Sequence, residues 1–271
     1  MSSESCRAAR WLARALVLCL VTAPALAIAQ GFAAYVSPPR VLMQMQPGQT
    51  QRQVIEIQHA GNQPGRYRFY TVDWSLSANG TVEFSQELVP QSCRPWVAIE
   101  RRELTLGPGD RYRYRFEVQA PADAPVRECR FAIMMEGLDP AAVSGGLNMP
   151  VSGRIGVIVY ANVGGAKPQL TVVEHRTEAE GSRKVPVLIV RNQGQAHGRL
   201  EGFLDGRDAD DRRYELAPRD LPVLPGEVRN IELIVLDQDR PEAVKPRFPL
   251  RVQGRLEWGD QRLPIDLTFA P

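Results

Sequence analysis

Residues 111–118 read RYRYRFEV, and this stretch decides the class of fold. Arginine or glutamate alternates with a large apolar residue along it. Successive side chains of a β-strand point to opposite faces, so a period of two predicts a strand with one buried and one solvated side. The arginines could bind an anion, but opposite an apolar face they are predicted to be the solvated side.

The same period of two recurs near the C-terminus, in residues 248–258 and again in residues 263–269. Gly259-Asp260 separates these two runs, and Asn79-Gly80 separates two shorter apolar runs upstream. Glycine, asparagine and aspartate tolerate the positive φ of tight hairpin turns. We therefore expect a β-hairpin at each place.

The first 29 residues have the layout of a cleaved signal peptide. Three arginines precede an apolar run at residues 15–21, which is too short to cross a bilayer. Ala27 and Ala29 stand where a signal peptidase requires small side chains. An uncleaved anchor is the alternative, and the short apolar run disfavours it. We expect export, with cleavage before Gln30.

Composition limits the partners of the exported chain. Removing the leader's three arginines and one glutamate from the 33 basic and 31 acidic residues leaves 30 of each. A formally neutral chain is not expected to bind nucleic acid. No later apolar run approaches the roughly 20 residues of a spanning helix, so no membrane insertion is expected.

The rest of the chain is expected to be all-β and to form two domains. Prolines and glycines interrupt it at short intervals, and no dozen residues carry a sustained helical stripe. Removing residues 1–29 from the 271-residue chain leaves 242, about twice the roughly 100 residues of an immunoglobulin-like sandwich. The strand-like pattern is interrupted by the segment GGAKP at residues 164–168. We expect two immunoglobulin-like β-sandwich domains, residues 30–163 and 169–271, joined by a linker at 164–168.

Two of the four cysteines leave with the leader, and Cys93 and Cys129 remain. An exported protein with two cysteines is expected to pair them. Closing a loop of this length would stabilise the first domain by about 4 kcal/mol. The alternative is a redox-active or metal-binding pair, which the absence of a C-x-x-C spacing and the scarcity of histidine disfavour.

Signals of catalysis are absent from the sequence. His59, His175 and His197 stand far apart and beside no recognisable nucleophile motif, and no G-x-S-x-G elbow occurs. The acidic group at residues 205–211 lacks the spacing of a calcium loop and alternates with arginines, which favours a solvated loop. We expect no enzyme, no catalytic residue, no cofactor and no metal site.

Across residues 35–161 the sequence resembles the first domain of the periplasmic pilus chaperones of the chaperone-usher pathway. The motifs that carry the resemblance are, in order, SPPRV at 37–41, VIEIQ at 54–58, TVDW at 71–74, RPWV at 94–97, LTL at 104–106, PADAP at 121–125 and ECRF at 128–131. The second domain is similar only in its strand-rich pattern. The cysteine pair is not universal in that family, which suggests a specialised branch.

The resemblance implies two sandwiches in a boomerang arrangement, whose cleft holds a pilus subunit that lacks its last strand. The chaperone lends an edge strand to the subunit and covers its apolar groove and unpaired backbone groups. By position the lent strand begins in the segment with Leu147, Met149 and Val151, which share one face. Pro150 interrupts this segment and cannot donate a ladder hydrogen bond, so pairing on one edge only is a further expectation.

The family also holds the subunit's C-terminal carboxylate with two basic residues in the cleft. By position these are Arg40 and Arg154, and a guanidinium can grip a carboxylate through two parallel hydrogen bonds. Without the resemblance, both would be taken as ordinary exposed arginines.

The resemblance therefore implies a periplasmic chaperone with pilus subunits and an outer-membrane usher as partners. Whether the unloaded chain self-associates is left open. The alternative is a non-chaperone periplasmic or surface protein on the same sandwich, such as a minor pilus subunit or an adhesin, because a fold does not dictate function. A subunit would need an N-terminal donor extension, and the short segment from Gln30 to the first strand disfavours it.

Overall fold

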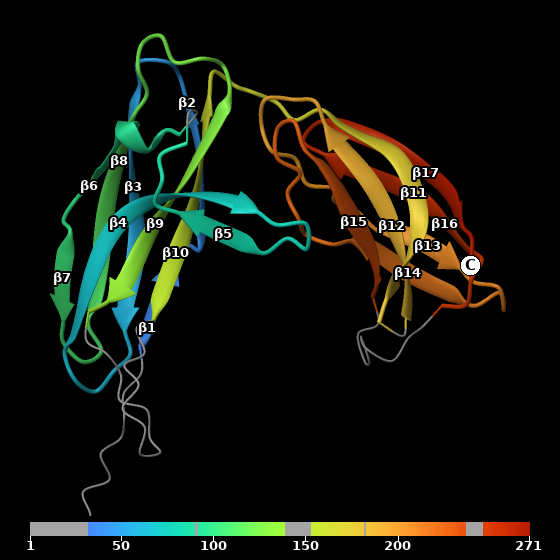
Figure 1. Ribbon diagram of the computed structural model, residues 1–271, viewed down its shortest axis with the longest axis horizontal. Helices are drawn as coiled ribbons and strands as arrows, with labels where there is room; N and C mark the ends of the chain where they lie inside the picture. Colours follow the sequence, from blue (N-terminus) through green and yellow to red (C-terminus); the bar gives the residue numbers. More distant parts are fainter. Residues whose placement is uncertain (1–31, 90–91, 139–152, 182, 237–245) are drawn as a thin grey trace, which may run out of the picture.

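The computed structural model describes residues 32–89, 92–138, 153–181, 183–236 and 246–271. Within these ranges the chain forms two β-sandwich domains joined by one crossing of the backbone (Figure 1). The helical content of the described residues is a single 3-10 turn, η1 (Arg94–Trp96), so the all-β prediction is confirmed. The expected leader and the donor residues Leu147, Met149 and Val151 lie outside the described residues.

The first domain packs two sheets face to face. One sheet has the strand order β1-β3-β8-β6, and the other has the order β2-β10-β9-β4-β5, with β7 also paired to β4. The strands are β1 (Ala34–Ser37), β2 (Arg40–Met45), β3 (Thr50–His59), β4 (Gly65–Leu76), β5 (Val82–Ser85), β6 (Val97–Ile99), β7 (Glu103–Leu106), β8 (Arg111–Gln119), β9 (Glu128–Gly137) and β10 (Arg154–Val163).

Strand β8 contains the alternating stretch that predicts the fold. Tyr114, Phe116 and Val118 are buried between the sheets, whereas the three arginines of the stretch are exposed. The arginine stripe is therefore the solvated face, as expected. The disulfide between Cys93 and Cys129 is also present, with its Cα atoms 5.8 Å apart, and it ties the segment before η1 to β9.

The second domain is a sandwich made by one continuously paired sheet of seven strands, which folds over a core of its own in the order β11-β12-β15-β14-β13-β16-β17. Its first and last strands approach each other, since the rings of His175 and Phe269 lie 5.4 Å apart. The strands are β11 (Leu170–Glu180), β12 (Arg183–Asn192), β13 (Leu204–Arg207), β14 (Arg213–Pro218), β15 (Val228–Val235), β16 (Leu250–Trp258) and β17 (Gln261–Phe269).

Both expected hairpins form. β16 and β17 flank Gly259, which adopts a φ of 54°, and β4 and β5 flank Gly80, which adopts a φ of 85°. The hairpin of β4 and β5 leans toward the second domain (Figure 1). There Arg229 Nη1 donates a 2.8 Å hydrogen bond to the carbonyl of Ser77. The hairpin is therefore a strut between the domains.

Two features of β10 prepare the functional site. The chain changes sheets after β1, so that β2 pairs with β10 in parallel, from Arg40 opposite Ile158 to Met45 opposite Val163. β9 pairs with β10 along residues 154–162, but within the described residues the first four residues of β10, 154–157, have no strand on their other side. This part of β10 is an open sheet edge.

The crossing between the domains is held by a loop of the second domain. Gln193 N–H donates to Gln169 O at 2.9 Å, and Gln195 N–H donates to Lys167 O at 3.0 Å. Gly194 lies between these two bonds, and a Cβ there would stand 2.4 Å from Gln169 N and from Lys167 O. Only glycine allows this backbone contact.

Gly194→Ala is therefore expected to lower the free energy of unfolding by about 1–3 kcal/mol, because the loop or the linker must move to admit a methyl group. Urea unfolding followed by circular dichroism measures it. Gln193→Ala, at an exposed neighbour in the same loop, is the control and should change little. A change below about 0.5 kcal/mol for Gly194→Ala would contradict this account.

Candidate functional site

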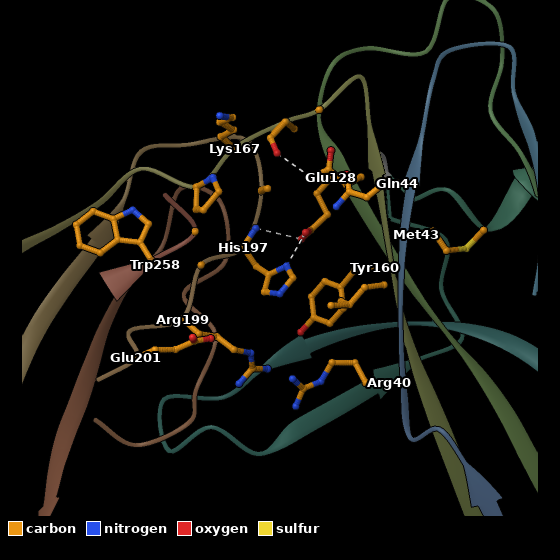
Figure 2. A pocket seen from close by; sticks show the side chains of 18 residues that line it. Arg40, Met43, Gln44, Glu128, Tyr160, Lys167, His197, Arg199, Glu201 and Trp258 are labelled. Atoms are coloured by element: carbon orange, nitrogen blue, oxygen red, sulfur yellow. Dashed lines mark hydrogen bonds and ion pairs between the residues drawn. The ribbon is translucent and has the colours of Figure 1, made fainter. Parts of the chain in front are cut away.

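A cavity of about 500 Å³ opens between the two domains (Figure 2). Strands β2, β9 and β10 of the first domain form one wall of it, and the loop around residues 196–201 with the end of β16 forms the other. No helix in the described part of the chain is long and apolar enough to cross a membrane. The described residues also contain no group of three or more His, Cys, Asp or Glu side chains arranged to hold a metal ion.

Strand β2 presents to the cavity the face that does not pack in the core. Val41, Met43 and Met45 are buried, and the residues between them alternate to the opposite face. Arg40, at the start of the strand, therefore reaches the cavity with a side chain that is 42% exposed.

The second domain contributes another arginine. Arg199 lies in the loop between β12 and β13, and its side chain is only 14% exposed. Its Nη1 donates to the carbonyl of Asp220 at 3.0 Å and also to the carboxylate of Asp220. Figure 2 shows the guanidinium groups of Arg40 and Arg199 pointing toward each other from the two walls. The arrangement concentrates positive charge at one end of the cavity.

Tyr160 of β10 lies beside these arginines. Burial raises the pKa of its hydroxyl, while the positive charges of Arg199 and Arg40 lower it in part. Its ring stacks on the imidazole of His197 at 3.9 Å and meets Trp74 edge to face at 5.4 Å. The neutral phenol is thus held firmly at the domain junction and can donate a hydrogen bond into the cavity.

A buried pair joins the domains at the other end of the cavity. Glu128 of β9 has a side chain that is 2% exposed, and His197 of the second domain has one that is 15% exposed. His197 donates to the Glu128 carboxylate twice, from Nδ1 at 2.5 Å and from its backbone N–H at 3.2 Å. The backbone N–H of Glu128 donates to Gln195 O at 2.8 Å. The pair holds the two walls of the cavity together.

The two arginines expected from the resemblance stand apart. Ile158, not Arg154, lies opposite Arg40, so about 13 Å of strand separates Arg154 from that position. Arg154 is exposed and stands opposite Glu136 of β9, and it does not line the cavity. The structure therefore brings Arg40 together with Arg199.

Sequence reasoning missed Arg199 because nothing local distinguishes it. It stands in a loop, without the alternation that places a strand residue, and in the domain where the resemblance is weak. Its partner Asp220 is 21 residues away in another loop. Two charged loop residues at such a spacing carry no pattern that could have identified the contact.

The three histidines are also separated in the structure. His59 contacts Tyr67 and the carbonyl of Gln63 inside the first domain, and His175 packs on Phe269 in the second. Only His197 lines the cavity, and its Nδ1 is engaged by Glu128. The histidines therefore do not combine into one site.

No family model matches the chain, and no curated protein matches its sequence. Solved structures do. The Escherichia coli chaperone DraB is 13% identical and 88% of this chain aligns with 98% of it, at a TM-score of 0.48. The class 5 fimbriae chaperone CfaA is 11% identical, and 88% of this chain aligns with 99% of it, at a TM-score of 0.46.

A structure of the Salmonella enterica SafA pilin in complex with the SafB chaperone matches at 12% identity, over 88% of this chain and 97% of that chain, with a TM-score of 0.43. These structures are thus of a chaperone, of a fimbriae chaperone and of a pilin in complex with a chaperone. The likeness concerns the fold, and what this chain binds has to be inferred from its own residues.

Proposed function

We propose that this protein is a periplasmic chaperone that holds a pilus subunit along the open edge of β10 and anchors the subunit's C-terminal carboxylate at Arg40. The observation that carries the proposal is the position of Arg40 at the end of that open edge. β2 covers β10 only from Ile158 onward, and Arg40 is the first residue of β2.

The backbone of the open edge is ready to pair. Ile158 N–H donates to Pro39 O at 3.1 Å, so the backbone of Ile158 faces the side where β2 lies. Backbone groups alternate sides along a strand, so those of Arg154 and Gly156 face the same side, where no strand of the described residues covers them. Unpaired edge groups are satisfied when a guest adds a strand.

The direction of the neighbouring strand fixes where the guest would end. β2 runs parallel to β10, and a guest strand in line with β2 and parallel to β10 would run toward Arg40. Its last residue would reach Arg40, where the cavity with Arg199 and Tyr160 begins. A free carboxylate is the group that two guanidiniums and a phenol suit best.

The remaining parts of the proposal rest on the resemblance. Leu147, Met149 and Val151 directly precede the open edge in the chain and would fill the subunit's groove as alternate side chains. Delivery to an outer-membrane usher follows in the same way. The disulfide between Cys93 and Cys129 supports an oxidising compartment such as the periplasm.

The test is a pull-down from the periplasm, with the co-purifying proteins identified by mass spectrometry. We expect small all-β subunits to be retained by the parent protein. Arg40→Ala and Arg199→Ala should each reduce the retained amount at least tenfold, because each removes a charge-assisted hydrogen bond of about 1.5–3 kcal/mol. The Arg154→Ala variant tests whether Arg154 also binds the subunit, since retention would then fall as it does for Arg40→Ala.

Arg52→Ala is the matched control, because Arg52 is an exposed arginine that pairs with Glu117 on the other sheet. It should retain subunits as the parent does. Retention that is unchanged by both Arg40→Ala and Arg199→Ala would refute the anchor, and no retained subunit would refute the chaperone function.

A further inference from the structure

The carboxylate of Asp220, in the loop between β14 and β15, lies against the two arginines of the cavity. One oxygen of this carboxylate accepts a hydrogen bond from Arg199 Nη1, and the other lies 3.9 Å from Arg40 Nη2. A single internal carboxylate therefore bridges the two arginines, which belong to different domains. Under the proposed function, the C-terminal carboxylate of a bound subunit would occupy this same position between the two arginines.

The two kinds of contact made by Asp220 differ in how easily they can be broken. Its side chain is 74% exposed, so the carboxylate can turn into solvent. Its backbone carbonyl still accepts a bond from Arg199 at 3.0 Å, and it keeps that guanidinium oriented. Exposed ion pairs contribute little stability, so displacement of the carboxylate is easy.

When the Asp220 carboxylate turns into solvent, the guanidinium groups of Arg40 and Arg199 lose the negative charge beside them. Arg199 is largely buried, and within the described residues its Nε is buried without a hydrogen-bond partner. The other charged side chains that the structure describes at the cavity make no ion pair with Arg40 or Arg199. Glu128 pairs with His197, Lys167 pairs with Asp260, and Glu201, which follows Arg199 on the same loop, pairs with neither arginine.

We propose that Asp220 is a resident competitor for the carboxylate anchor. It neutralises Arg40 and Arg199 while the cleft is empty, and the C-terminal carboxylate of a guest displaces it. This inference rests on the proposed function and adds its regulation. The competition lowers the affinity for an acidic chain end, which must displace Asp220, and it leaves the affinity for a neutral chain end unchanged.

The test uses two synthetic peptides of ten residues, with alternating valine and serine, that end in a free carboxylate or in an amide. Isothermal titration calorimetry measures their dissociation constants for the parent, Asp220→Asn and Arg199→Ala. The asparagine keeps an oxygen that accepts from Arg199 and removes only the charge. Asp220→Asn is expected to bind the acid peptide about threefold more tightly, which is the scale of an exposed ion pair, and the amide peptide unchanged.

Asp260→Asn is the control for net charge, since Asp260 is an exposed aspartate near the same cavity that pairs with Lys167 and contacts neither arginine. It should leave both dissociation constants unchanged. Arg199→Ala should abolish the preference for the acid peptide.

The outcomes separate this inference from the proposed function. If the parent prefers the acid peptide and Asp220→Asn binds it equally or less tightly, Asp220 is no competitor, while the anchor stands. If the parent binds neither peptide, or does not distinguish them, the anchor itself is refuted and the competitor with it.

Discussion

Replacing Cys93 and Cys129 together by alanine is expected to lower the free energy of unfolding of the first domain by about 4 kcal/mol. The bond spans 36 residues, which include β6, β7 and β8, so its loss returns much freedom to the unfolded chain. Both cysteines are buried in the core of the first domain. A loss of this size is a large fraction of the stability of an ordinary domain.

Urea unfolding followed by tryptophan fluorescence measures this effect, because Trp74 and Trp96 belong to the first domain and Trp258 to the second. The parent protein treated with a reductant should be destabilised like the double variant, since both lack the same bond. The second domain, which contains no cysteine, should unfold as before. A loss below about 1 kcal/mol would show that the bond constrains little.

The second large effect is expected from Glu128→Ala, at the junction of the domains. Removing the acceptor of a buried hydrogen bond leaves its donor unsatisfied, which costs about 1–3 kcal/mol for each donor. Here both the imidazole and the backbone N–H of His197 lose their acceptor. The expected result is a less stable protein in which the domains unfold in two separate steps.

Separate unfolding would appear as different midpoints for the fluorescence of Trp258 and of the first-domain tryptophans. Glu128→Gln is the matched control, because an amide oxygen can still accept from His197 while the charge is lost. It should be destabilised less than Glu128→Ala. One shared transition with parental stability in Glu128→Ala would mean that the β4–β5 strut and the apolar contacts hold the domains without this pair.

The residues of the candidate site differ in how well the sequence predicts them. Arg40 is expected in the cleft only because the SPPRV motif resembles a family, and it lines the cavity between the domains. Arg154 was assigned to the same place, and the register of β10 against β2 puts Ile158 there instead. A register is set by the pairing of strands that are more than a hundred residues apart, and one strand's own pattern does not contain it.

The sequence by itself determined the strands, the hairpin turns and the pairing of the two cysteines, because these follow from neighbouring residues and from composition. The period of two in RYRYRFEV requires only that one face be apolar, and β8 buries that face. Gly80 and Gly259 meet a local backbone requirement for positive φ.

Only the tertiary structure decided which strand edge stays open and which charges meet in the cleft. Arg40, Tyr160, Arg199 and Asp220 come from four separate segments of the chain. They converge because β2 changes sheets to pair with β10, and because the Glu128–His197 pair and the strut fix the second domain against the first. Such contacts depend on the packing of whole sheets, for which no stretch of sequence has a local signal.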